Sequence, residues 1–352
     1  MNNSCTDWSN RSARVFAVLF GAIALCALSE GVAARASKPP QYSIIGAVSG
    51  PDGGWDYATV DPDARRLYVA RQHGIAVLDL TARAWLPSLA PDLRGSGLAV
   101  VSDGSRVLAS DSRTMQLALL NALTGSVVGA VSVGAEPDAV AFDASTGIAA
   151  AVTPGKVLLV DVERLALLST IPIAGKLEFA VADGRGMVYV NNESTGELIA
   201  LDLKRRAVAR RTHLKGCSEP TGLALDAADG LLIAACGNKV ATVVRAVDGV
   251  EIARVGIGEG ADAVFYDAAR KLAFVPCGES GTLVIIDLSD IGRIHVRQTL
   301  STEVGARTGA VDDVTGMVYL PTGTPGPIVP PDHWPSLVPG TFKVLVVAPR
   351  PR

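Results

Sequence analysis

Residues 219–249 carry short apolar runs that are separated by polar turns. The stretch contains the apolar runs EPTGLALD, LLIAAC and KVATVVRAVDG, and an AADG turn lies between the first two. Runs of this length, bounded by Asp and Gly, predict consecutive antiparallel strands. Because such a unit alone leaves strand edges unpaired and one face uncovered, it predicts further copies of itself along the chain.

The copies are present, and they are marked by acidic residues at the ends of the runs. The acid after the first run recurs at spacings of 42, 40, 40, 43, 41 and 45, as Asp61, Asp103, Asp143, Asp183, Asp226, Asp267 and Asp312. The acid after the third run recurs as Asp79, Asp161, Asp202 and Asp287, with Asn121 in the same role. A period near 41 with four strands per unit predicts an all-β, seven-bladed β-propeller. A short carboxylate caps its own turn, so we interpret these acids as scaffold.

The two ends of the repeat region complement each other. Residues 42–48 form one predicted strand with no repeat around it, whereas the last repeat has strands at 308–311, 317–320 and 341–347 and no fourth. We therefore predict that the N-terminal strand closes the last of seven four-stranded antiparallel blades. Residues 37–352 then form one domain, with a Pro-rich insertion at 322–340. A loop this long is usually functional or disordered, and both interpretations stay open.

The first 36 residues have the three regions of a secretory signal peptide. Arg11 and Arg14 precede an apolar run at 15–29, and Ala34-Arg35-Ala36 offers a cleavage site. The run is short for a membrane span, so we expect cleavage after Ala36, no membrane span afterwards, and a periplasmic or secreted product.

The mature chain would be mildly acidic. Removal of residues 1–36 takes away three basic residues (32 to 29) and two acidic residues (35 to 33), which leaves a net charge of −4. Nucleic-acid-binding proteins usually carry a basic face, so a nucleic-acid partner is not expected. We expect a monomer that binds a small-molecule or protein ligand.

Three cysteines remain after residue 36, and two of them belong to the same blade. The first two strands of that blade run antiparallel around residues 227–230, which places Pro220 opposite Cys236 and Cys217 a few residues beyond. An exported chain meets an oxidising compartment. We predict a Cys217–Cys236 disulfide with Cys277 as a free, buried thiol; the alternative is three reduced thiols that pack as small apolar groups.

Several runs of residues resemble those of a known protein family. They are WDYATVDPDARRLYV, EPDAVAFDASTG, KLEFAVADGRGMVYVNN, CSEPTGLALDAADGLLIAACGNKV, GADAVFYDAARKLAFV and GARTGAVDDVTGMVYLPT. Over residues 42–348 the chain resembles the YncE-like, YVTN-repeat family of secreted seven-bladed propellers. The resemblance implies a periplasmic binding or scaffold protein, in some members associated with an outer-membrane uptake system. It implies no catalytic residues, because the family has no settled set.

The blade topology predicts where a ligand site would lie. In a propeller, the links from one blade to the inner strand of the next lie on the same face as the loops between second and third strands. We call this end of the central channel the mouth. The predicted ligand-binding residues in the links are Trp55, Asp56, Tyr57, Asp138, Glu178, Phe179, Glu219, Asp262 and Arg307. The loops and the insertion add His73, Asn192 and His333.

Each of these residues also has a structural interpretation. Asp138 and Glu219 lie beside prolines at 137 and 220 and could cap the strand start, while Glu178 could pair with Arg307 or Lys176. The aromatic residues of the WDY run could plug the channel. As a group, however, converging carboxylates repel one another and need a cation, a proton or a partner. Oxygen ligands suit Ca²⁺ or Mg²⁺, and the expected metal set is Glu178, Glu219 and Asp262, with Asn192 beside it.

Three functional hypotheses follow. The first is an exported binding protein or scaffold with its ligand site at the acidic, aromatic mouth. The second is a metal-dependent lactonase- or lyase-like enzyme in which the same carboxylates hold the cation and His73 or His333 acts as acid or base. The third is a structural envelope protein. The sequence contains none of the common motifs for hydrolases, metalloproteases, nucleotide binding or haem attachment.

Overall fold

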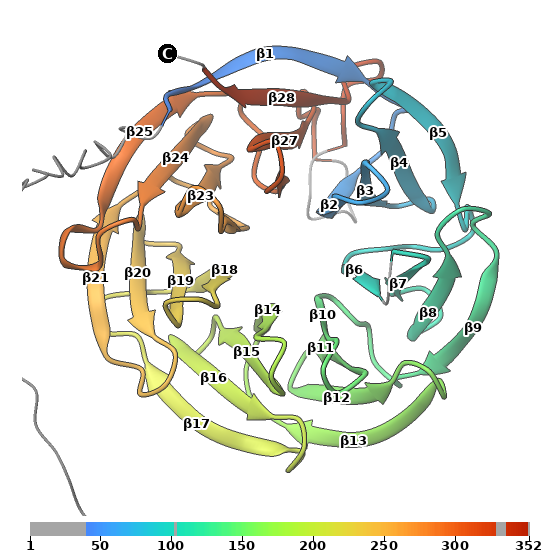
Figure 1. Ribbon diagram of the computed structural model, residues 1–352. Coiled ribbons are helices and arrows are strands. Elements are labelled where there is room, and N and C mark those ends of the chain that lie inside the picture. Colours follow the sequence, from blue (N-terminus) through green and yellow to red (C-terminus); the bar gives the residue numbers. More distant parts are fainter. Residues whose placement is uncertain (1–39, 102–103, 329–335, 351–352) are drawn as a thin grey trace, which may run out of the picture. The chain divides into compact units, whose positions relative to one another are not determined.

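The computed structural model describes residues 40–101, 104–328 and 336–350. Three sequence predictions lie outside the described residues: the signal peptide at 1–36, the turn acid Asp103, and His333 in the insertion. Within the described part, seven antiparallel sheets of four strands each are arranged in a ring, as Figure 1 shows. The predicted seven-bladed β-propeller is therefore confirmed.

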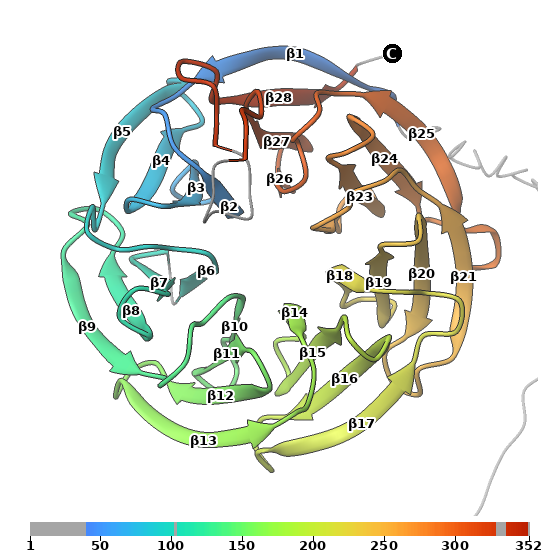
Figure 2. The same cartoon turned by 180° about the vertical axis from the view of Figure 1, so that it is seen from behind.

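Each blade runs from an inner strand near the ring axis to an outer strand at the perimeter (Figures 1 and 2). Blade one contains β2 (Trp55–Asp61), β3 (Arg66–Arg71), β4 (Ile75–Asp79) and β5 (Ala84–Leu89). Blade two contains β6 (Leu98–Val101), β7 (Arg106–Asp111), β8 (Gln116–Asn121) and β9 (Val127–Ser132). Blade three contains β10 (Val140–Asp143), β11 (Ile148–Thr153), β12 (Lys156–Asp161) and β13 (Ala166–Pro172). Blade four contains β14 (Leu177–Ala182), β15 (Met187–Asn192), β16 (Glu197–Asp202) and β17 (Ala207–His213).

The remaining blades follow the same order. Blade five contains β18 (Pro220–Asp226), β19 (Leu231–Cys236), β20 (Val240–Arg245) and β21 (Glu251–Gly256). Blade six contains β22 (Phe265–Asp267), β23 (Leu272–Cys277), β24 (Thr282–Asp287) and β25 (His295–Ser301), with a short 3₁₀ helix at Ile291–Arg293. Blade seven contains β26 (Ala310–Asp312), β27 (Met317–Thr322), β28 (Lys343–Pro349) and β1 (Tyr42–Ser49).

The core lies between neighbouring blades. One buried cluster joins Ala150 and Val157 of blade three to Val188 and Ile199 of blade four. The middle strands therefore have apolar residues on both faces, and all six residues of β19 are buried. Outer strands cover only one face and alternate between half-buried and exposed positions, as β17 does. This arrangement accounts for the unbroken apolar runs in the sequence.

The ring is closed by pairing the two ends of the propeller. Strand β1 pairs antiparallel with β28, with Tyr42 opposite Pro349 and Ser49 opposite Lys343. Figure 1 shows β1 lying outside β28 at the junction between blades six and one. The side chain of Gln298 in β25 hydrogen-bonds both the backbone NH and the carbonyl of Tyr42 at 2.8 Å. The prediction that the N-terminal strand completes the last blade is confirmed.

The repeated acids bind the backbone of their own turns. Asp61 accepts hydrogen bonds from the amides of Asp63 and Ala64, and Asp226 accepts from those of Ala228 and Asp229. The acid after the third strand does the same, since Asp79 accepts from the amides of residues 81 and 82. These contacts confirm the scaffold interpretation of the periodic acids.

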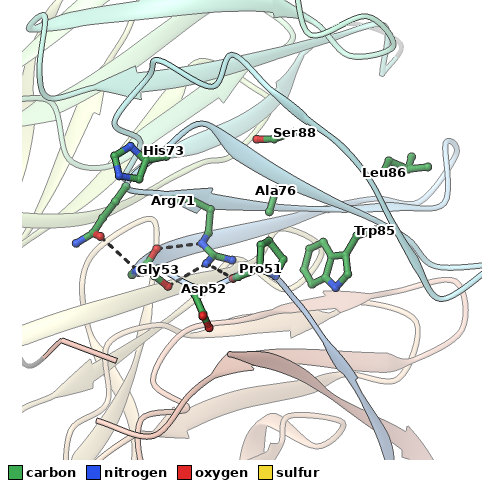
Figure 3. Close-up of a pocket in the computed structure, with 11 residues that line it drawn as sticks. Pro51, Asp52, Gly53, Arg71, His73, Ala76, Trp85, Leu86 and Ser88 are labelled. Carbon is green, nitrogen blue, oxygen red and sulfur yellow. Dashed lines mark hydrogen bonds between the residues drawn. The ribbon is translucent and has the colours of Figure 1, made fainter. Parts of the chain in front are cut away.

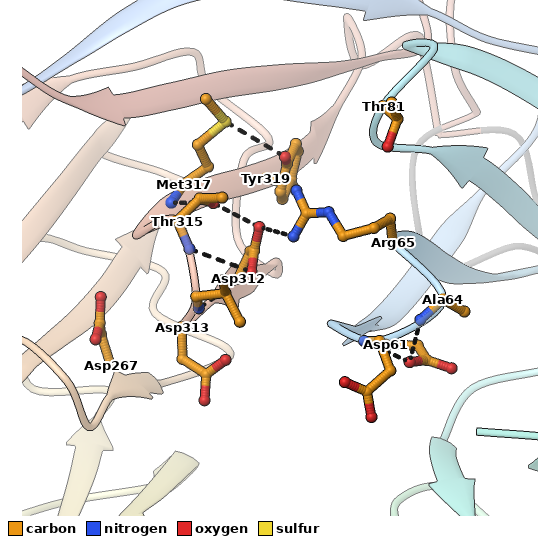
Figure 4. A network of polar contacts seen from close by, with 12 residues as sticks. Asp61, Ala64, Arg65, Thr81, Asp267, Asp312, Asp313, Thr315, Met317 and Tyr319 are labelled. Atoms are coloured by element: carbon orange, nitrogen blue, oxygen red, sulfur yellow. Dashed lines mark hydrogen bonds and ion pairs between the residues drawn. The ribbon is translucent and has the colours of Figure 1, made fainter. Parts of the chain in front are cut away.

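Asp312 also links two blades across the closure point. Its buried carboxylate forms an ion pair with Arg65 of blade one and accepts a hydrogen bond from the hydroxyl of Thr315 (Figure 4). Arg65 lies in the turn between β2 and β3 and has a positive φ of 54°. The hydrogen bonds and the ion pair hold the pKa of Asp312 below its ordinary value, against the effect of burial.

The predicted disulfide between Cys217 and Cys236 is present, with the Cα atoms 5.4 Å apart. Pro220 lies opposite Cys236 in the β18–β19 register, as the sequence predicted. Cys277 is free and buried. Among the described residues, no helix is long and apolar enough to cross a membrane.

The closure predicts a large cost for replacing Tyr42 with alanine. Tyr42 is 2% exposed and packs edge-on against Phe274 of blade six, with ring centroids 5.1 Å apart. We expect Tyr42→Ala to lower the free energy of unfolding by about 3–5 kcal/mol, as for other buried aromatic residues. Ile45→Ala, on the exposed side of the same strand, should change it by about 0.5 kcal/mol or less. Equal costs in chemical denaturation would show that β1 is not docked as described.

Candidate functional site

Four carboxylates lie at the mouth, just before or at the start of inner strands. Asp56 is in β2, Asp138 precedes β10, Glu178 is in β14 and Asp262 precedes β22. Glu178 is buried, at 5% exposure, and the other three are half-buried. The inner strands converge on the ring axis (Figure 2), which brings acids from blades one, three, four and six into one site.

An aromatic contact joins the inner strands of blades one and four. The ring of Tyr57 from blade one meets Phe179 from blade four edge-to-face, with centroids 4.8 Å apart. Tyr57 is buried and belongs to the core cluster that includes Leu177. Because blades one and four are not neighbours, this contact spans the axis. This contact agrees with the alternative interpretation of Tyr57 as a buried residue that fills the channel.

Arg307 connects three blades at one side of the mouth. Its Nε donates to Asp262 Oδ2 at 3.0 Å, and its Nη2 donates to the carbonyl of Trp55 at 3.3 Å. The guanidinium also lies 5.5 Å from the centroid of the Trp55 ring. The neighbouring Thr308 donates its hydroxyl to the carbonyl of Asp56 at 2.9 Å. Arg307 thus ties the start of β2 to blades six and seven.

Lys176 is the second cation of the site and occupies the link before β14. Its ammonium lies 2.8 Å from Glu178 and 2.5 Å from Glu193. Of the two partners proposed for Glu178 from the sequence, the structure selects Lys176. Glu193 lies at the loop after β15, and sequence analysis did not identify it. Among the described residues, five carboxylates of the mouth thus share two cations.

Burial and mutual repulsion raise the pKa values of two acids in the mouth. Burial, followed by the charges of Asp138 and Asp262, raises the pKa of Asp56 to about 7, against the lowering effect of Arg307. Burial, followed by the charge of Asp262, raises the pKa of Asp138 to about 6. Both carboxyl groups therefore exchange protons near neutral pH, where an ordinary Asp is fully ionised.

The other titratable groups respond to the same crowding. Burial raises the pKa of Tyr57 well above its ordinary value, and the charges of Asp262, Asp138, Asp56 and Glu178 raise it further. The pKa of Glu178 is raised by burial and by a hydrogen bond with Glu193, against the lowering effect of Lys176. The pKa of Glu193 is lowered by its hydrogen bonds to Glu178 and Lys176, despite its burial.

The other predicted site residues either lie away from the four carboxylates or hold the backbone in place. The exposed Glu219 has its carboxylate against Gly237, in the turn after β19. Asn192 is fully buried and donates its amide to the carbonyl of Ala174, so it fixes the link before β14. The exposed His73 lines a separate pocket in blade one, shown in Figure 3.

The expected metal set is not assembled. Within residues 40–101, 104–328 and 336–350, no three His, Cys, Asp or Glu side chains are placed to hold a metal ion. Glu178 and Asp262 are each paired with a cation instead, Lys176 and Arg307 respectively. The mouth as described is suited to electrostatic binding and proton exchange.

Comparison with known proteins identifies the fold. No family model and no curated protein match the sequence. The WD40 repeats of RRP9 superpose with a TM-score of 0.72 at 12% identity, covering 89% of this chain and 99% of that one. The propeller domain of Cps50 (Swd1) from Myceliophteria thermophila gives 0.70 at 11%, covering 88% and 99%.

A third structure, hydrazine synthase of Kuenenia stuttgartiensis, gives a TM-score of 0.67 at 13% identity. It covers 78% of this chain and 94% of that one. At identities this low the likeness shows the fold alone. The chain has a seven-bladed, WD40-like propeller fold.

The raised pKa values predict a stability that falls as pH rises. Between an ordinary Asp pKa near 4 and the folded values of about 6 and 7, the folded state holds more protons than the unfolded state. The stabilising effect is therefore complete below about pH 4 and is lost as pH rises through 6 to 7.

Asp138→Asn should remove part of this dependence. We expect its melting temperature to exceed that of the wild type at pH 8 and to vary less between pH 5 and pH 8. Asp63→Asn, at an exposed position, serves as the control and should retain the wild-type pH profile. A pH profile of Asp138→Asn that parallels the wild type would contradict the electrostatic coupling.

Proposed function

We propose that this protein is an exported binding protein whose mouth takes a small ligand with a positively charged group. The observation that carries the proposal is the excess of carboxylates over cations at the mouth. In the part of the chain that the structure describes, two basic side chains, Lys176 and Arg307, lie there with five acids: Asp56, Asp138, Glu178, Glu193 and Asp262. A cationic ligand would offset the remaining repulsion, which protons offset in its absence.

An aromatic ring beside the acids favours an organic cation. Phe179 follows Glu178 in β14 and is half-buried, and its ring packs edge-to-face against the buried Tyr57. Ammonium groups bind over such rings by cation–π attraction, which adds to the attraction of the carboxylates. A metal ion gains less from these surroundings, because no three described side chains form a ligand set. The arrangement thus supports a binding protein better than a metal-dependent enzyme.

The proposal also covers the protein family and the cellular location of this chain. We assign the chain to the YncE-like, YVTN-repeat propellers on the motifs that precede the inner strands, including WDY at 55–57 and EPTG at 219–222. The basic, apolar and small-residue regions of residues 1–36 support export to the periplasm. The Cys217–Cys236 disulfide is consistent with an oxidising compartment. A protein partner at the mouth, such as an uptake system, would use the same carboxylates.

The test compares a charged ligand with a neutral one of the same shape. Thermal unfolding is measured at pH 8 with benzylamine, with benzyl alcohol, and with Ca²⁺ or Mg²⁺. We expect benzylamine to raise the melting temperature, because a ligand specific for the folded state stabilises it, by about 2.7 kcal/mol at 100 times Kd. Benzyl alcohol should have little effect. Stabilisation by the metal ions alone would favour the enzyme hypothesis, and no stabilisation by any of them would favour a structural protein.

Variants locate the binding site. Asp138→Asn combined with Glu178→Gln should remain folded and lose the benzylamine effect, since both carboxylates belong to the mouth. Glu219→Gln is the matched control, because this acid also lies in an inter-blade link but its exposed carboxylate is directed to Gly237. Equal responses of the double variant and the control to benzylamine would place the binding elsewhere.

A further inference from the structure

A pocket in blade one lies apart from the acidic cluster. It is formed by the 51–54 segment between β1 and β2, the β3–β4 loop and the outer strand β5 (Figure 3). Its volume is about 250 Å³, which is enough for a small organic molecule. The polar side chains on its wall are Asp52, Arg71, Gln72, His73 and Ser88.

Arg71 is the unusual member of this wall because it is a buried cation. The residue is 4% exposed, at the end of β3. Its Nε donates to the carbonyl of Gly54 at 3.0 Å, and its Nη2 donates to the carbonyls of Pro51 and Gly53 at 2.7 and 2.9 Å. One face of the guanidinium lies 3.8 Å from the centroid of the Phe342 ring.

The positive charge of Arg71 is incompletely compensated. Its Nη1 has no acceptor among the described residues, and no described carboxylate lies within ion-pair distance of the guanidinium. Burial lowers the pKa of Arg71 to about 10, against the raising effect of the negative charge of Asp52. Asp52 Oδ1, however, accepts its hydrogen bond from the amide of Gly340 and not from Arg71. Buried charges are normally paired, so this cation favours an anion in the pocket.

The rest of the pocket favours an anion with an apolar body. The indole of Trp85 donates to the carbonyl of Ser49 at 2.7 Å, which fixes the ring at the pocket wall. Ala76, Leu86 and Pro51 continue this apolar side. His73 and Gln72 are exposed at the opening, where they can donate hydrogen bonds to an oxygen anion.

We propose that this pocket binds a small carboxylate that carries an apolar or aromatic group. The carboxylate would lie beside Arg71, with Gln72 and His73 as further donors, and the apolar group would pack against Trp85 and Leu86. The proposal does not depend on the function assigned to the mouth, because the two sites use different residues and opposite charge.

Benzoate is the probe, and benzamide is its neutral counterpart. Calorimetric titration at low salt should show benzoate binding to the wild type, benzamide binding at least tenfold more weakly, and inorganic phosphate binding more weakly than benzoate. Ligand-dependent quenching of Trp85 fluorescence should follow the same order and disappear in Trp85→Phe. Equal binding of benzoate and benzamide would overturn the proposal, and so would preference for phosphate or a lack of benzoate binding.

Two variants with opposite expected effects test the role of charge. Arg71→Gln should weaken benzoate binding about tenfold to hundredfold, the range for hydrogen bonds and charge interactions with an ionised group. Because Arg71 also fixes the 51–54 segment, Asp52→Asn provides a second variant that keeps the acceptor for Gly340. It removes a negative charge from the pocket wall and should strengthen binding about threefold. Weaker binding to Asp52→Asn would contradict the assignment.

Variants with substitutions at the mouth test whether the pocket binds benzoate independently of the mouth. Asp138→Asn combined with Glu178→Gln should leave benzoate binding unchanged, since neither side chain lines the pocket. Loss of benzoate binding in that variant would show that the anion binds at the mouth and would overturn the pocket assignment. A failure of benzylamine to bind would leave the benzoate result standing, so the two proposals fail separately.

Discussion

The pairing of β1 with β28 is the constraint on which the rest of the structure depends. Each blade buries its middle strands against two neighbours, so the first and last blades cannot complete their cores until the ring is closed. The last blade supplies three strands from the C-terminal end and one from the N-terminal end. The Gln298–Tyr42 hydrogen bonds tie blade seven to blade six, and the Arg65–Asp312 ion pair ties it to blade one. Closure fixes the inner strands around one axis, and only then do the four carboxylates meet.

The backbone fold of this protein could be predicted from the sequence, because it depends on the pattern of residues that are close together in the chain. The acids at a period near 41 cap turns wherever they are described, and the alternation of run and turn sets the strand order. The strand order in turn placed Pro220 opposite Cys236 and thereby the disulfide. These features depend on the neighbours of each residue in the chain and on the handed, repetitive geometry of sheets.

Which residues make up the site could be predicted only in part, because this depends on the direction and length of each side chain. Topology assigned Asp138, Glu178 and Glu219 to the same face, but the direction of each side chain separates Glu219 from the other two. The contact of Tyr57 with Phe179 requires a side chain to cross the axis, which no repeat pattern specifies. The 51–54 segment folds around the guanidinium of Arg71, and this contact determines what the side chain does. In the sequence, Arg71 only marks the end of an apolar run, which does not indicate such a role.

Like charges are crowded at the mouth, where we propose the binding site. A protonated Asp56 or Asp138 relieves the repulsion at low pH, and a bound cation would relieve it at neutral pH by displacing the proton. The most direct test is calorimetry of benzylamine binding at pH 7 in buffers of different ionisation enthalpy, which counts the protons exchanged. Benzylamine is already charged at this pH, so we expect a net release of protons from the mouth. Binding without proton release, or with proton uptake, would contradict it.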